Sequence, residues 1–173
     1  MNNKMIKNFE KISIRGRVAF AISCLENSIK FYSLEQLDWS FLVNKLWSYT
    51  NSNIGTWHYI MSEATPFGVV GQTDNVDDLE YLSVEEIKKL EILYINSNKV
   101  VNSIIDLIFD IGTRDLYASI VNNSPTTIKY LTEIIELLSD NQIPLPDIEK
   151  FKKFSISENE GWGNEFTKEM VFD

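Results

Sequence analysis

The chain is poor in the residues that build metal and redox centres, with a single cysteine, Cys24, and a single histidine, His58. One cysteine excludes an internal disulfide, which suits a reducing cytoplasm. One histidine excludes a two-histidine metal site and the paired Glu-x-x-His motifs of di-iron helical proteins. The seven glycines form neither a GxGxxG nor a GxxxxGK pattern, the signatures of phosphate-binding loops. We therefore expect no metal, no cofactor and no catalytic residues.

Long apolar runs are missing too. The best, residues 103–111, is interrupted by Asp106 and Asp110 and falls short of the roughly 20 residues that a membrane-spanning helix needs. Residues 1–17 lack the apolar centre of a signal peptide. We therefore expect a cytoplasmic protein that makes no use of a membrane. Asp106 and Asp110 lie one helical turn apart, and we expect both at exposed positions of an amphipathic helix.

Positive charge is scarce. There are 16 Lys and Arg residues against 25 Asp and Glu, so the net charge is −9. The excess is uneven, because residues 62–92 hold eight acidic and only two basic residues. A surface of this sign repels a polyanion, which argues against nucleic acid as a partner. It favours a basic protein partner instead.

What the chain does contain is typical of a globular domain. A length of 173 residues and a hydrophobic fraction of 44% suit one domain, residues 1–173, with a real core. Apolar residues recur at intervals of three and four without sustained alternation, which predicts an all-α bundle of six or seven helices. We expect helices over 15–32, 38–49, 56–64, 84–112 with a possible break at 96–98, 114–121 and 125–139, and a helical turn over 147–152.

Local signals refine these boundaries. Ser83 to Glu86 reads as a capping box, with Ser83 as N-cap and Glu86 at the third helical position. Ser124 followed by Pro125 marks another helix start, and Asp38 is a plausible N-cap of the second helix. The segments outside the helices are predicted as an N-terminal arm over 1–14 anchored by Phe9, Ile12 and Ile14, a long loop over 65–82, and a tail or wrap-around segment over 155–173.

The predicted partner-binding residues come from the two acidic stretches. Asp74, Asp77 and Asp78 lack the spacing and the central glycine of an EF-hand, which argues against a calcium site. They suit either a solvated acidic loop or a contact surface for a basic partner, and the binding hypothesis rests on the second. Trp162 lies between Gly161 and Gly163, where it could pin the C-terminal segment to the domain or serve as a binding hot spot. The predicted contact residues are Asp74, Asp77, Asp78, Glu80, Tyr81, Glu158, Glu160 and Trp162.

Two other functions remain open. A small-ligand protein or an enzyme would need a helical pocket in which His58 meets a carboxylate, with Tyr32, Trp47 and Tyr94 as further lining. An oligomeric adaptor would expose an apolar helix face. Cys24 lies in mid-helix beside Leu25 and is expected to be a buried small hydrophobe rather than a nucleophile.

Two stretches suggest a family. Residues 17–26, RVAFAISCLE, followed by Leu46 and Trp47, resemble the opening helices of small helical immunity proteins from bacterial toxin–immunity systems, the polymorphic-toxin and contact-dependent-inhibition type. Phe154 and Ser155, followed by GWG at 161–163, resemble the ending of such proteins. The resemblance implies a bacterial protein that neutralises a cognate toxin domain, often a basic nuclease, by covering it. It implies no catalytic residues, because such proteins act by binding.

Overall fold

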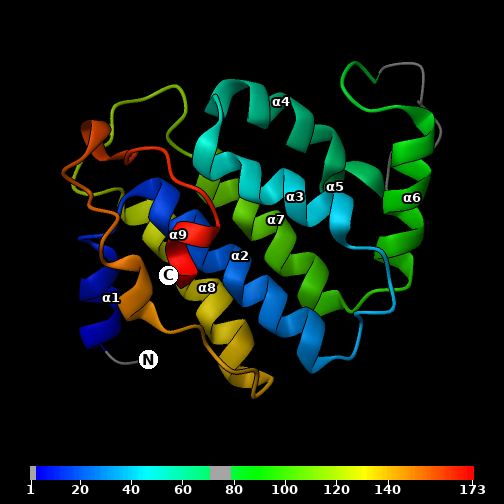
Figure 1. Ribbon diagram of the computed structural model, residues 1–173, viewed down its shortest axis with the longest axis horizontal. Helices are drawn as coiled ribbons and strands as arrows, with labels where there is room; N and C mark the ends of the chain where they lie inside the picture. The colour runs from blue at the N-terminus through cyan, green and yellow to red at the C-terminus, as the bar shows by residue number, and fades with distance from the viewer. Residues whose placement is uncertain (1–2, 71–78) are drawn as a thin grey trace.

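The computed structural model describes residues 3–70 and 79–173, and within them the chain is helical apart from connections. An isolated antiparallel bridge joins Ile12 to Ser155, and the described residues contain no β-strand. The predicted all-α class is therefore confirmed (Figure 1). The elements are α1 (Asn3–Phe9), α2 (Ile14–Phe31), α3 (Ser40–Trp47), η1 (Ser48–Asn51), α4 (Ile54–Ala64), α5 (Pro66–Val69), α6 (Val84–Ile95), α7 (Lys99–Thr113), α8 (Pro125–Asp140), η3 (Ile148–Phe151), η4 (Asn159–Gly161) and α9 (Glu169–Phe172).

Helix α2 forms the centre of the bundle. It packs against α3, α7, α8 and η3, and Figure 1 shows it crossing the middle of the molecule between α3 and α8. Its residues from Ile14 to Leu25 are all buried, polar ones included. Cys24 is among them, as predicted, and burial raises the pKa of its thiol well above the ordinary value. A neutral, buried thiol is unreactive.

Arg17 is a buried cation in this central helix. Its side chain has no exposed surface. Nε donates to the carbonyl of Phe9 at 3.0 Å, and Nη1 donates to the Ser124 carbonyl at 3.2 Å and to Oγ1 of Thr127 at 2.7 Å. Burial lowers the pKa of Arg17 to about 10, with Asp115 opposing the shift, so the guanidinium remains charged at neutral pH. One side chain thus ties α1, α2 and α8 together.

Most predicted helix boundaries match the structure. The Ser83 capping box has both of its hydrogen bonds. The chain breaks between α6 and α7, where the Asn98 side chain accepts the Val100 N–H. Ser124 caps α8, with Pro125 at its first turn. Asp38 accepts hydrogen bonds from Ser40 at the start of α3, although the N-cap residue itself is Trp39.

Three predictions for the connecting segments were wrong. Residues 114–117 form a turn and 118–121 an irregular connection instead of a helix. Oδ2 of Asp115 accepts the hydroxyl hydrogen of Ser124, and the chain runs through three left-handed residues, 122–124. The 65–82 loop contains a helix, α5, which Thr65 caps and Pro66 starts. The 1–14 arm contains α1, although its anchors Phe9, Ile12 and Ile14 are buried as expected.

The C-terminal segment wraps around the bundle, one of the two forms predicted for it. The Ser13 N–H donates to the carbonyl of Phe154, and the Phe166 N–H donates to that of Thr50. The rings of Phe154 and Phe166 stack with centroids 3.7 Å apart. Gly163 has φ of +87°, and a Cβ atom there would collide with the Ser13 side chain, so glycine is required where the chain returns to α2.

A membrane span is not found among the described helices, none of which is both long and apolar enough to cross a bilayer.

Candidate functional site

The predicted contact residues fall in three places. Asp74, Asp77 and Asp78 lie outside the described residues. Glu80 and Tyr81 lie just before α6, against α4. The third group, Glu158, Glu160 and Trp162, lies in the C-terminal wrap. Of the predicted contact residues in the first acidic stretch, Glu80 and Tyr81 are therefore the two whose surroundings the structure describes.

Glu63, on α4, fixes the position of this pair. Its carboxylate accepts the backbone N–H groups of three successive residues, Glu80 at 2.8 Å, Tyr81 at 3.0 Å and Leu82 at 2.8 Å. A charged acceptor shared among three N–H donors is a strong arrangement. We call it the Glu63 clamp. It holds the chain before α6 against the outer side of α4.

An exposed series of aromatic rings runs from this clamp across α4. The ring of Tyr81 stacks on that of Tyr59 with centroids 5.5 Å apart and planes at 11°. His58 lies 5.3 Å from Tyr59 and 6.2 Å from Tyr117, and it stacks on Phe109 of α7. A hydrogen bond to Tyr59 raises the pKa of Tyr117 above its ordinary value. We name Tyr81, Tyr59, His58 and Tyr117 the aromatic row.

The outer rings of the row are open to solvent. Tyr81 is 44% exposed, Tyr59 46% and Tyr117 80%. Large aromatic side chains at such exposure gain free energy when a partner covers them, and tyrosine is enriched at protein interfaces. His58 is held between aromatic neighbours, which makes it part of the support of the row.

The loop that carries Tyr117 is anchored at its far end. Asn122, Asn123 and Ser124 have φ values of 51°, 56° and 50°. Consecutive left-handed residues other than glycine cost free energy and persist only where the surroundings enforce them. Here the bond from Ser124 to Asp115 and the bond from Arg17 to the Ser124 carbonyl do so. The exposed loop is therefore tied to the core beneath it.

An acidic furrow between α7 and α8 adjoins this region. It has a volume of about 520 Å³. Phe67, at the start of α5 and 88% exposed, donates its N–H to Asp106 at the edge of the furrow. The carboxylates that line it are Asp106, Glu133, Glu136 and Asp140. Within the described residues no three His, Cys, Asp or Glu side chains converge closely enough to hold a metal ion.

The expectation that Asp106 and Asp110 are exposed needs correction. Both are only half-exposed, because α5 and α8 pack on either side of α7. Partial burial raises the pKa of both carboxyls, and each is raised further by a neighbouring acid, Asp110 for Asp106 and Glu133 for Asp110. The furrow thus concentrates negative charge that costs free energy in the isolated protein.

Replacing Asp106 with asparagine is therefore expected to stabilise the protein at neutral pH. The amide oxygen can still accept the Phe67 N–H, while the repulsion disappears. A carboxyl whose folded pKa is raised destabilises the fold when ionised, and this penalty vanishes below its unfolded value of about 3.9. Chemical unfolding of both proteins between pH 3.5 and 7.5 measures the effect. If the gain in stability of Asp106→Asn over the unsubstituted chain grew as the pH fell, the raised pKa of Asp106 would be contradicted.

Replacing Glu63 with glutamine tests the clamp. The amide nitrogen cannot accept an N–H, so one of the bonds to residues 80–82 is lost together with the charge. We expect the free energy of unfolding to drop by about 1.5–3 kcal/mol. We also expect faster amide exchange at residues 80–82. The matched control is Glu136→Gln, which removes the same charge from an exposed position on α8. Equal losses in the two variants would mean that the clamp has no special role.

Trp162 lies apart from the aromatic row, beside the first turn of α4. It is half-buried and packs on the core, and its carbonyl accepts the Arg15 N–H. With Arg15, Asn53 and Glu165 it lines a hollow of about 410 Å³. These contacts favour the interpretation in which Trp162 pins the C-terminal segment to the domain.

The predicted His58 pocket does not assemble. Nδ1 of His58 is buried and lacks a hydrogen-bond partner among the described residues. Its ring contacts are aromatic, as given above. The other side chains named for that pocket are engaged elsewhere: Tyr32 donates to Asn141, Trp47 to Glu26, and Tyr94 to the Ala64 carbonyl.

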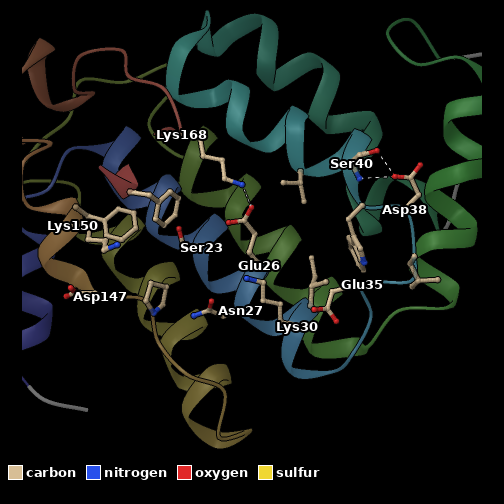
Figure 2. A pocket seen from close by; sticks show the side chains of 17 residues that line it. Ser23, Glu26, Asn27, Lys30, Glu35, Asp38, Ser40, Asp147, Lys150 and Lys168 are labelled. Atoms are coloured by element: carbon tan, nitrogen blue, oxygen red, sulfur yellow. Dashed lines mark hydrogen bonds and ion pairs between the residues drawn. The ribbon is translucent and has the colours of Figure 1, made fainter. Parts of the chain in front are cut away.

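A groove of about 830 Å³ follows the solvent-facing side of α2 (Figure 2). Glu26, at its centre, accepts hydrogen bonds from Lys168 and from the Trp47 indole. Asp38, at the far end, is held by Ser40. Figure 2 labels both residues, together with lysines that also line the groove, so the groove contains charges of both signs. Since these carboxylates are already bonded within the chain, we interpret the groove as the seam between α2, the α3 region and the C-terminal wrap.

Sequence reasoning missed Tyr59 and Tyr117 as surface residues of interest, and it missed the role of Glu63 in holding residues 80–82. A signal for Tyr59 was present, because Trp57, Ile60 and Met61 define the buried side of α4 and leave Tyr59 outside. The clamp and the Tyr117 loop depend on contacts between distant segments, and helical periodicity does not predict such contacts.

Comparison with protein-family models, with curated proteins and with solved structures finds no match for this chain.

Proposed function

We propose that this chain is a bacterial, cytoplasmic immunity protein that binds a basic toxin domain and neutralises it by covering its working surface. The observation that carries the proposal is the aromatic row with carboxylates beside it. Three exposed tyrosines supply anchors, and Glu80 and the acidic furrow supply charge complementary to a basic protein. The resemblance of residues 17–26 and 161–163 to immunity proteins adds the class of partner.

The composition of the surface suits this role. A stable interface buries about 800 Å² on each partner, with a few aromatic anchors near its centre and charged groups around them. Charge of one sign steers a partner of the other sign into contact and raises the association rate. The aromatic row supplies the anchors, and the furrow between α7 and α8 supplies the charge.

Co-expression tests the proposed function. The toxin-like product of the gene adjacent to this one is produced alone and together with the full chain, and growth and co-purification are measured. We expect growth to be rescued and a stable complex to be recovered. An adjacent product that stays toxic and does not co-purify, or the lack of any toxin-like neighbour, would overturn the proposal.

A second candidate is an oligomeric adaptor. Ile92 and Ile95, one turn apart on α6, are 62% and 67% exposed. Beside Ile92, Phe41 and Leu37 line a small, largely apolar hollow. Size-exclusion chromatography with light scattering distinguishes this candidate: a dimer that Ile92→Lys converts to a monomer would support it, and a monomer at high concentration would exclude it.

A further inference from the structure

We propose that the aromatic row is a receptor for a guanidinium group, so that an arginine side chain of the protein partner lies against an open face of the Tyr59–Tyr81 stack. This inference rests on the proposed function and specifies the chemistry by which the partner is recognised. It also places the centre of the interface on α4 and the clamp, away from the groove of Figure 2.

Ring geometry provides the first argument. Tyr59 and Tyr81 stack nearly parallel, and each leaves almost half of its surface open. Tyr117, at the other end of the row and more exposed, lies nearly perpendicular to His58. The face of an aromatic ring is electronegative and attracts a cation within about 6 Å of its centre. In the Tyr59–Tyr81 stack each ring covers one face of the other, so the outward face of either ring is open to a cation.

Fixed negative charge beside the rings provides the second argument. Glu80 is exposed and adjacent to Tyr81. Partial shielding from solvent, then the charge of Glu80, raises the pKa of Tyr81, which is the direction expected of an anionic environment. Glu63 adds a carboxylate whose position is set by three backbone N–H groups. A cation on these rings would gain attraction from both carboxylates.

The shape of the surface favours arginine over lysine. A guanidinium is planar, more weakly hydrated than an ammonium and stacks on aromatic faces. The ammonium of lysine holds its water more strongly and has no flat face to match the rings. Exposed tyrosines that lie flat against each other thus discriminate in favour of arginine.

The row is preorganised from both ends. The clamp uses the backbone N–H of Tyr81 and leaves its side chain free, while the left-handed residues before α8 hold the Tyr117 loop. Rings that are already in place lose little conformational entropy when a partner binds. The Glu63 clamp and the three left-handed residues thus hold two exposed loops in position for a partner.

Titration of the full chain with short peptides tests the inference. The probes are hexa-arginine, hexa-lysine and hexa-citrulline, the last being the uncharged isostere of arginine. Binding of each is followed by the NMR signals of the tyrosine rings and of the backbone amides. We expect hexa-arginine to shift the Tyr59, Tyr81 and Tyr117 signals, to bind at least twofold more tightly than hexa-lysine, and to lose affinity with added salt. Hexa-citrulline should leave the signals unchanged.

Two variants make the test specific. Tyr81→Leu keeps the backbone bonds of the clamp and removes the ring, and should weaken hexa-arginine binding about two- to fivefold. The control Phe31→Leu removes a ring of similar exposure at the end of α2 and should have no effect. Both variants are checked for folding by thermal unfolding.

Three results would overturn the inference: equal binding of hexa-arginine and hexa-lysine, full affinity in Tyr81→Leu, or shifts confined to Glu133 and Glu136 in the furrow. None of them bears on the co-expression result, so the proposed function would stand if the toxin were still neutralised. Conversely, if hexa-arginine bound to the aromatic row but the toxin did not bind to the chain, only the proposed function would be contradicted.

Discussion

Replacing Arg17 with alanine is expected to lower the free energy of unfolding by about 3–5 kcal/mol, the largest effect of any single change proposed for this chain. The guanidinium is fully buried and donates to Phe9, Ser124 and Thr127. Without it, the Phe9 carbonyl keeps only the Ile12 N–H and the Ser124 carbonyl keeps its donors from α8, while the Thr127 hydroxyl loses its donor and a cavity replaces the side chain. For a domain of this length the melting temperature should fall by roughly 10 °C.

Arg17→Lys is the informative companion. Lysine keeps the positive charge but cannot donate in several directions from a planar group. It should recover a small part of the lost stability. Lys30→Ala, an exposed change on the same helix, serves as the control and should be close to neutral. Stability is measured by chemical unfolding at pH 7, and a loss of less than 1 kcal/mol in Arg17→Ala would show that the buried cation is not the link between α1, α2 and α8.

Removing Tyr59 and Tyr81 together is expected to weaken toxin binding by at least about 30-fold, equivalent to about 2 kcal/mol for the loss of a hot spot. The two rings stack on each other, so the double alanine variant removes the anchor as a unit and the single changes need not add. Because both side chains are largely exposed, the stability of the free protein should change by less than about 1 kcal/mol.

The matched control for this prediction is Phe31→Ala. Phe31 is 47% exposed, similar to Tyr59 and Tyr81, but lies at the C-terminal end of α2. Isothermal titration with the purified toxin, inactivated if necessary, measures the dissociation constants of the unsubstituted chain, the double variant and Phe31→Ala at one salt concentration. Unchanged affinity in the double variant would move the interface elsewhere, and a loss as large in Phe31→Ala would show that general destabilisation is the cause.

The accuracy of sequence reasoning differed between local and long-range features. Ser83, Ser124 and the Asn98 break were predictable because capping depends on residues a few positions apart. Residues 114–121 were predicted as a helix, yet the bond between Asp115 and Ser124 and the contact of Arg17 with Ser124 hold the segment in another path. Those contacts join α2, a loop and α8, and no local pattern encodes them.

The candidate site shows the same division. The sequence indicated an acidic surface bearing aromatic residues, and Glu80 with Tyr81 was part of that prediction. Tyr59 and Glu63 lie in a short helix about twenty residues earlier, and their pairing with residues 80–82 is a tertiary contact. Asp106 was expected to be exposed because helical periodicity alone cannot reveal that α5 packs beside it and donates a hydrogen bond.

Hydrogen exchange of the toxin complex tests the central claim most directly, because it maps the interface without any substitution. The full chain is compared free and bound to its toxin. We expect slower exchange in residues 54–70, 79–83 and 114–121, which carry the aromatic row and its supports, and unchanged exchange in 146–151 and α9 beside the groove. Protection confined to the groove and α9, with none at 79–83, would contradict the account.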